Sequence, residues 1–285
     1  MNEDLLGRSR ARTSSGELSF IDYGEGPALV LLHGFPTSSV IWHEFIPILG
    51  MSMRVIAPDL LGYGESDKPA GVDLSLSAQT RYIRELLATQ GIEEFAVCGH
   101  ELGGGIAQLL AVSGTVHTIA LIDSIAFDPG PSPEVDTPVG FVDAWLEEAI
   151  AHRERITDEI RAELNAPFAG VGGSEALRRA AGALGVGGLP DEPALAAIEA
   201  PTLLLWGEDD PFVPVAVAER LNETIPSSTL ALLPGCSHLL TLDAPETVGG
   251  LLHEYLRSRY LGAGHAHAEP AGPVPLALTH RPDHT

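Results

Sequence analysis

The chain has 285 residues, of which 45% are hydrophobic, so it has room for one large α/β domain with an insertion and a normal core. Its formal net charge of −23 would repel nucleic acids and anionic membranes, which argues against both as partners. The two cysteines cannot form a disulfide framework, no apolar run approaches the about 20 residues of a membrane span, and the N-terminus lacks the apolar region of a signal peptide. We therefore expect a cytoplasmic protein.

In the first part of the chain, segments typical of strands alternate with segments typical of helices. The predicted strands are two short ones within 10–23, followed by 28–32, 53–57, 94–98 and 118–122. The predicted helices run from Ser38 or Ser39, either of which could be the N-cap, to about Leu49, and from Ser77 to Gln90. Such alternation predicts a parallel sheet with helices on both faces.

The alternation stops at about Ser124. Residues 125–200 contain proline, glycine and short amphipathic helices, expected at 141–153, 156–164 and 175–184, but no convincing strand. Two glycine groups, 170–173 and 185–188, resemble the hinges of a moving lid, and ordinary loop flexibility explains them equally well. We predict a helical cap over 125–200, inserted into an α/β core formed by 1–124 and 201–261.

The core resumes with predicted strands at 201–206 and 229–233 and helices at about 215–223 and 245–260. The tail, 262–285, is rich in Pro, Ala and His, and we expect it to be a disordered extension rather than a metal site. The glycines at 103–105 are followed by neither a Walker lysine nor a Rossmann spacing, so we expect no nucleotide, metal or other cofactor.

One short stretch carries the strongest functional signal. A predicted strand ends at Cys98 and runs into a predicted helix through Gly99-His100-Glu101-Leu102-Gly103. This is the pattern of a nucleophile elbow, whose tight turn exposes the central side chain. That residue is usually Ser, Cys or Asp, whereas here it is Glu101.

Further stretches accompany the elbow in a fixed order. They are His33-Gly34-Phe35-Pro36-Thr37-Ser38-Ser39, Arg54 to Pro69 with its Gly62-Tyr63-Gly64-Glu65-Ser66-Asp67-Lys68-Pro69 ending, Trp206-Gly207-Glu208-Asp209-Asp210 and Gly235-Cys236-Ser237-His238. With them the chain resembles the α/β-hydrolase-fold enzymes, and most closely the branch of epoxide hydrolases and haloalkane dehalogenases. The resemblance implies a mostly parallel, doubly wound sheet with a helical cap inserted after the sixth strand.

The resemblance also implies a catalytic triad in the order nucleophile, acid, histidine, filled by Glu101, Asp210 and His238. Asp209 is a rival for the acid, but the residue spacing favours Asp210. The backbone N–H groups of Phe35 and Leu102 should form the oxyanion hole above residue 101.

The substrate pocket is expected at Phe35, His100, Phe141, Trp145 and Leu239. Phe141 and Trp145 share a face of a predicted cap helix, and packing onto the core is the alternative role for both. For His33 and His100 we also expect a structural role, in which they hydrogen-bond to the backbone of the tight loops around them.

Two markers of the family are missing. Dehalogenases of this branch hold the leaving halide with Asn after His-Gly and Trp after the nucleophile, where this chain has Phe35 and Leu102. Epoxide hydrolases activate the epoxide oxygen with cap tyrosines, but all five tyrosines here lie outside 125–200. Dehalogenation is therefore disfavoured, and the usual epoxide reaction lacks its acid.

Three hypotheses for the function remain at this point. The first is a hydrolase of a small epoxide, ester or lactone, in which Glu101 is a carboxylate nucleophile or positions water. The second is a lyase, isomerase, dehydratase or cyclase in which Glu101 and His238 transfer a proton. The third is a catalytically weak small-molecule binder. In each case we expect a small-molecule partner and a monomer or homodimer.

Overall fold

The computed structural model describes residues 7–128, 130, 132–184 and 188–262, with only the backbone at residue 171. The predicted disordered tail beyond 262 and most of the second glycine group lie outside these residues. The strands are β1 (Arg8–Thr13), β2 (Gly16–Tyr23), β3 (Ala28–Leu32), β4 (Arg54–Pro58), β5 (Phe95–His100), β6 (Val116–Ile122), β7 (Thr202–Gly207) and β8 (Ser228–Leu233). The core helices are η2 (Ser39–Trp42), α1 (Ile46–Leu49), α2 (Leu76–Thr89), α3 (Leu102–Val112), α8 (Val215–Thr224), α9 (Leu240–Asp243), α10 (Pro245–Leu256) and η5 (Arg257–Leu261).

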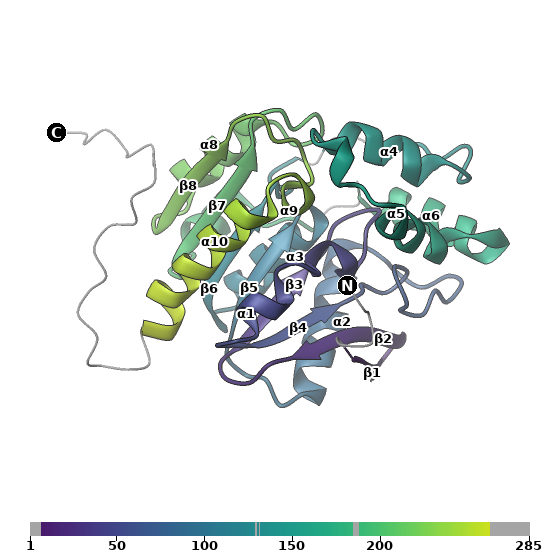
Figure 1. Ribbon diagram of the computed structural model, residues 1–285. Helices are drawn as coiled ribbons and strands as arrows, with labels where there is room; N and C mark the ends of the chain where they lie inside the picture. The colour runs from purple at the N-terminus through teal and green to yellow at the C-terminus, as the bar shows by residue number, and fades with distance from the viewer. Residues whose placement is uncertain (1–6, 129, 131, 185–187, 263–285) are drawn as a thin grey trace.

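The strands form one eight-stranded sheet in the order β1-β2-β4-β3-β5-β6-β7-β8. The β1–β2 and β2–β4 pairs are antiparallel and all the others are parallel. Helices α2 and α3 pack together on one face, and α1 and α10 on the other (Figure 1). The parallel strands all end at one edge, which is where open α/β sheets bind their ligands.

β3 and β5 lie in the middle of the sheet and are buried along their whole length. Their sequences, Ala-Leu-Val-Leu-Leu and Phe-Ala-Val-Cys-Gly-His, are nearly continuous apolar runs, as expected for strands covered on both faces. The buried core therefore holds the loops after β3 and β5 in fixed positions at the ligand-binding edge.

The helix predicted from Ser38 or Ser39 to Leu49 is wrong in one respect, because it is two short helices. Ser38 does cap the first, η2, through a hydrogen bond that its Oγ accepts from the Val40 N–H (3.4 Å). The second, α1, carries Pro47 in its first turn. Proline has no N–H and would clash with the carbonyl one turn earlier, so it starts a helix but cannot continue one.

Between β6 and β7 the described residues form helices and no strand. These are α4 (Phe141–Ala149), η3 (Arg153–Arg155), α5 (Asp158–Asn165), η4 (Ala166–Phe168), α6 (Gly170–Leu184) and α7 (Glu192–Ala196). Helices α4, α5 and α6 lie together at the end of the sheet where β5 leads into α3 (Figure 1), whereas α7 packs against α3 and α8 of the core.

The structure corrects two predictions for this region. Residues 170–173 belong to α6 rather than to a hinge; Gly173 lets the helix approach η4 closely, since an added Cβ would lie 2.5 Å from the Phe168 backbone. The helix predicted over 141–153 ends at Ala149, because the next N–H groups, of Ala151 and His152, hydrogen-bond to Asp243 instead. In the described part of the chain, no helix is long and apolar enough to cross a membrane.

Candidate active site

The turn between β5 and α3 has the geometry of a nucleophile elbow. Glu101, at its tip, adopts φ 48° and ψ −110°, a conformation that residues with a side chain rarely adopt. Two glycines make the tight turn possible: a Cβ on Gly99 would lie 2.2 Å from the Gly103 carbonyl oxygen, and one on Gly103 would lie 2.1 Å from that of Leu32. The local sequence thus dictates the strained turn, which places residue 101 at the edge of the sheet, where it is 8% exposed.

The carboxylate of Glu101 lies in the predicted oxyanion hole. Its Oε2 accepts hydrogen bonds from the backbone N–H of Phe35 (2.9 Å) and of Leu102 (2.5 Å). Within the described ranges, no residue donates a hydrogen bond to Oε1. The two N–H groups therefore converge as the sequence predicted, but the atom between them belongs to the elbow residue itself.

Two opposing effects act on this carboxylate. Burial raises the pKa of Glu101, while the neighbouring His238 and the two N–H donors lower it, and the net shift is upward. The position at the N-terminus of α3 also favours negative charge. Glu101 is thus a buried carboxyl group that is held through one of its two oxygens.

His238 and Asp210 meet beside the elbow. The imidazole Nδ1 donates to Asp210 Oδ2 over 2.9 Å, and both side chains are buried. Asp210 Oδ1 in turn accepts from the N–H groups of Phe212 (2.7 Å) and Val213 (3.0 Å), which fixes the carboxylate. Asp209, the rival in the sequence, is exposed. No hydrogen bond joins Glu101 and His238 among the described residues.

The two loop histidines hydrogen-bond to backbone, as predicted. His33 Nδ1 donates to the Gly34 carbonyl oxygen (2.8 Å) and its Nε2 accepts from the Leu60 N–H (2.9 Å). His100 Nε2 donates to the His238 carbonyl oxygen (2.9 Å), and its ring lies 4.7 Å from the His238 ring. Burial lowers the pKa of His100 well below its usual value, so it is neutral. His100 thus lies beneath His238 and supports it.

Aromatic side chains surround these groups. Phe141 and Trp145 lie one turn apart on α4; the Phe141 ring is 5.9 Å from Phe35, and the Trp145 ring is 5.9 Å from His238. Phe212 stacks on Trp145 and also touches the His238 ring at 5.1 Å. Leu239, the remaining predicted pocket residue, is fully buried in the core cluster.

Two further aromatic residues were not predicted for the site. Tyr63 contacts Phe35, with ring centroids 6.5 Å apart, and Phe168 of the cap, at 6.3 Å. The second of these two residues is Phe212, which the sequence analysis missed although it follows Asp210 by only two positions. The Gly-Tyr-Gly sequence around Tyr63 is the one local signal that could have drawn attention to it.

Asp243 joins the histidine loop to the cap. Its buried carboxylate accepts hydrogen bonds from the N–H groups of Ser237 (2.7 Å), His152 (2.8 Å) and Ala151 (2.9 Å). On the other side of His238, the Leu239 N–H donates to the carbonyl oxygen of Ala149, the last residue of α4. The residues on both sides of His238 are therefore bound to the end of α4.

A second buried carboxyl lies behind the triad, at the end of β6. Asp123 Oδ1 accepts from the Gly207 N–H (2.9 Å), and Oδ2 has no partner in the described chain. Burial, together with the charges of Asp210 and Asp243, raises the pKa of Asp123 well above its usual value. This carboxyl therefore keeps its proton at pH values at which an exposed aspartate is already charged.

The charges at this site are mainly negative. Among the described residues, no Arg or Lys forms an ion pair or hydrogen bond with Glu101, Asp210 or His238. Three cap arginines pair with carboxylates elsewhere: Arg153 with Glu147, Arg155 with Glu246, and Arg161 with Asp143 and Glu147. Arg178 and Arg179 donate to backbone carbonyl oxygens, of Val135 and Pro69 respectively. In the same part of the chain, no group of three His, Cys, Asp or Glu side chains could hold a metal ion.

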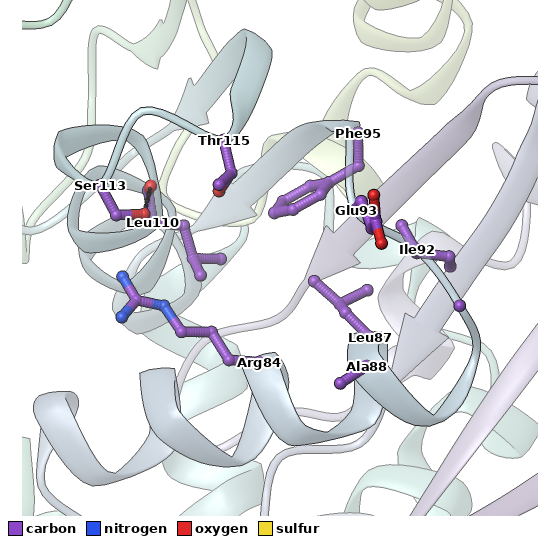
Figure 2. Close-up of a pocket in the computed structure, with 10 residues that line it drawn as sticks. Arg84, Leu87, Ala88, Ile92, Glu93, Phe95, Leu110, Ser113 and Thr115 are labelled. Carbon is purple, nitrogen blue, oxygen red and sulfur yellow. Dashed lines mark hydrogen bonds between the residues drawn. The ribbon is translucent and has the colours of Figure 1, made fainter.

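An open pocket of about 440 Å³ lies at the opposite edge of the sheet, where β5 begins (Figure 2). It is lined by Arg84, Leu87, Ala88, Gly91, Ile92, Glu93, Phe95, Leu110, Ser113 and Thr115. Because Glu101 follows the other end of β5, this pocket is separate from the elbow and its aromatic surroundings.

Comparison with known proteins agrees with this architecture. The model of the alpha/beta hydrolase family matches residues 29–249. Haloalkane dehalogenase 2 of Mycobacterium tuberculosis is 27% identical over 269 residues, covering 85% of this chain and 92% of that protein. Fluoroacetate dehalogenase of a Burkholderia species is 39% identical over 108 residues, 36% of each chain. The structure of a thermophilic esterase from Thermogutta terrifontis is similar, with a TM-score of 0.76 and 26% identity over 88% of this chain and 98% of that one. The chain therefore belongs to the alpha/beta hydrolase family.

Proposed function

We propose that this α/β hydrolase acts on a small organic substrate of the epoxide, ester or lactone class, with Glu101 as carboxylate nucleophile. In the proposed reaction Oε1 attacks a saturated carbon atom of the substrate, the C–O bond at that carbon breaks with its electron pair on oxygen, and the substrate becomes an ester of Glu101. His238 then removes a proton from water, which attacks the ester, and Asp210 orients the imidazole. Hydrolysis releases the product and restores the carboxylate.

The position of Glu101 Oε2 between the N–H groups of Phe35 and Leu102 carries this proposal. That arrangement leaves Oε1 free to attack. Once the ester has formed, Oε2 is its carbonyl oxygen, and the same two donors stabilise the negative charge that develops on it when water attacks. Loss of one such donor costs about 10²–10³ in rate in other enzymes.

The same arrangement favours one of the three substrate classes. An ester or lactone whose own carbonyl is attacked needs an empty oxyanion hole, but Oε2 of Glu101 fills this one. Attack on a saturated carbon needs no second oxyanion site. Among the three classes, an epoxide therefore fits best.

Alkyl halides fit less well, although the relatives include dehalogenases. The side chains of Phe35 and Leu102 are both apolar and buried, with Phe35 packed on Phe141. Neither can donate a hydrogen bond to a leaving halide. We therefore maintain the prediction that halide release is disfavoured.

Proton transfer without hydrolysis is the second candidate. It is favoured by the burial that raises the pKa of Glu101, since a carboxylate with a higher pKa is a better base near neutral pH. In this case Glu101 and His238 would exchange protons with the substrate and no ester would form.

Mass spectrometry separates these candidates. We would mix His238→Ala with styrene oxide or γ-butyrolactone, whose ring opening retains every atom of the substrate, and expect an adduct of the mass of the substrate on the peptide carrying Glu101. The control His253→Ala, on α10, should turn over normally and carry no adduct. If Glu101→Gln retains turnover and His238→Ala forms no adduct, the nucleophile is not Glu101. Solvent deuterium in the product, without ¹⁸O from labelled water, would indicate proton transfer.

A further inference from the structure

The side chain of Tyr63 lies between the oxyanion hole and the cap. It belongs to the loop that follows β4, and its side chain is 1% exposed. Its ring contacts Phe35, which supplies one N–H of the hole, and Phe168 of η4 in the cap. The side chain therefore comes from the core but lies against the boundary at which a substrate must bind.

The hydroxyl of Tyr63 has no hydrogen-bond partner within the described residues. Tyr82, which is equally buried, differs in this respect, because its hydroxyl donates to the Asp73 carbonyl oxygen (3.1 Å). An unpaired hydroxyl in a protein interior is costly, so buried hydroxyls normally have partners. The Tyr63 hydroxyl is not among the fully buried, unpaired side-chain atoms of the described residues, so the oxygen of a bound ligand can reach it and become its partner.

The electrostatics determine which role the hydroxyl can play. Burial raises the pKa of Tyr63 well above its usual value, and the charge of Glu101 raises it further. The phenol is therefore protonated throughout the range in which the protein would work, and it can donate a hydrogen bond. The influence of Glu101 also indicates that the phenol lies within electrostatic reach of the carboxylate.

We propose that the Tyr63 hydroxyl donates a hydrogen bond to an oxygen atom of the bound substrate, and that in an epoxide it protonates the oxygen that leaves carbon. This proposal rests on the function proposed above and names the acid for that reaction. Oε1 of Glu101 forms a bond to carbon, and the C–O bond breaks with its electron pair on oxygen, which takes the phenol proton. The proton released when water hydrolyses the ester returns, through His238, to the tyrosinate.

Binding of two probes of equal shape tests the donor without requiring turnover. Acetophenone carries a carbonyl oxygen where α-methylstyrene carries a CH₂ group, so only the ketone can accept a hydrogen bond. We would titrate both into the wild type, Tyr63→Phe and Tyr82→Phe by calorimetry. Tyr82→Phe is the matched control, because it also removes the hydroxyl of a tyrosine that is 1% exposed.

We expect the wild type and Tyr82→Phe to bind the ketone more tightly than the alkene. Tyr63→Phe should bind the ketone about two- to tenfold more weakly, as for the loss of one neutral hydrogen bond, and the alkene unchanged. Equal affinity of the wild type for both probes, no measurable binding of the ketone, or an unchanged preference in Tyr63→Phe would overturn the proposal. If Tyr63→Phe does not fold, the comparison on the wild type still decides. A missing Glu101 adduct would instead count against the proposed nucleophile and leave this result intact.

Discussion

The Phe35 N–H donates a hydrogen bond to Glu101 Oε2 over 2.9 Å, and Gly34 makes this contact possible. A Cβ at residue 34 would lie 2.7 Å from Glu101 Cβ and 2.8 Å from Oε2. Glutamate is one methylene longer than the aspartate found in the dehalogenase and epoxide hydrolase branch. The bare glycine opposite provides the space in which the longer side chain reaches the hole.

Replacing Gly34 by alanine should push the carboxylate out of the oxyanion hole. Because a displacement of about 1 Å can lower a rate about 10²-fold, we expect turnover of styrene oxide by Gly34→Ala to fall by at least that factor. Gly182→Ala in α6 is the control, since nothing lies within 4 Å of its added Cβ. Steady-state kinetics would be measured for both variants and for the wild type. Equal rates for Gly34→Ala and the wild type would show that turnover does not depend on the position of Oε2.

Asp210→Asn should slow hydrolysis of the ester more than its formation. The amide can still accept hydrogen bonds from Phe212 and Val213, but it no longer stabilises the charged imidazole. In a serine protease the corresponding change costs about 10⁴ in kcat with the geometry intact. We expect a loss of similar order, with an adduct on Glu101 that accumulates and is seen by intact mass. Asp209→Asn, on the exposed neighbour, should behave like the wild type; if it is as slow as Asp210→Asn, the assignment of the acid is wrong.

Asp123 should make the folded protein less stable as the pH rises. Its pKa is raised by burial, so the folded state binds the proton more tightly than the unfolded state does. The free energy of unfolding therefore decreases from the ordinary carboxyl pKa upward, until the pH passes the raised pKa. Asp123→Asn should remove this dependence and unfold at a higher temperature than the wild type above neutral pH. Thermal unfolding across pH measures the effect, and an Asp209→Asn control should retain the slope of the wild type.

Small anions should not bind at the elbow. The site carries Glu101 and Asp210, and within the described residues no Arg or Lys pairs with either of them, while Arg153, Arg155 and Arg161 of the cap pair with carboxylates elsewhere. Fluoroacetate, after which one relative is named, has a carboxylate that would be repelled. We expect millimolar fluoroacetate to leave the melting temperature unchanged, whereas an uncharged aromatic ligand such as acetophenone should raise it. Stabilisation by fluoroacetate that is lost in Glu101→Gln would contradict this expectation.

Asp243→Asn should loosen both the histidine loop and the end of the cap helix. An amide cannot accept hydrogen bonds through its nitrogen, so some of the bonds to Ser237, Ala151 and His152 are lost, at a cost of about 1–3 kcal/mol in the free energy of unfolding. Hydrogen exchange should become faster at 150–152 and 237–239 and remain unchanged in β3. Asp191→Asn, which weakens a similar carboxylate cap on the Ala194 N–H, is the control and should leave both segments protected.

The elbow and the pairing of Asp210 with His238 could be predicted because short backbone motifs encode them. The glycines at 99 and 103 require a tight turn, and the order of the strands brings the loops after β5, β7 and β8 to one edge. The side-chain position of Glu101 could not be predicted in this way, because it depends on a contact with Phe35 across the sheet edge.

The site residues that could not be identified from the sequence are those whose role depends on contacts between distant segments of the chain. Asp243 appears as one acidic residue in a short helix until its bonds to Ala151 and His152 are seen. Tyr63 lies outside the cap in the sequence, yet it packs on Phe168 of the cap. Glycine was misleading at 170–173, since close packing against η4 and flexibility favour the same residue type.

The spacing of Phe141 and Trp145 on α4 sets a length scale for the ligand. One ring lies against Phe35 and the other against His238, and the four-residue spacing of their positions separates them by about 6 Å along the helix axis. A molecule that spans both rings touches the nucleophile side and the base side together, whereas a shorter one reaches only one of them. Under the proposed function, the rise along helix α4, rather than any one side chain, would therefore set the shortest substrate that contacts both rings.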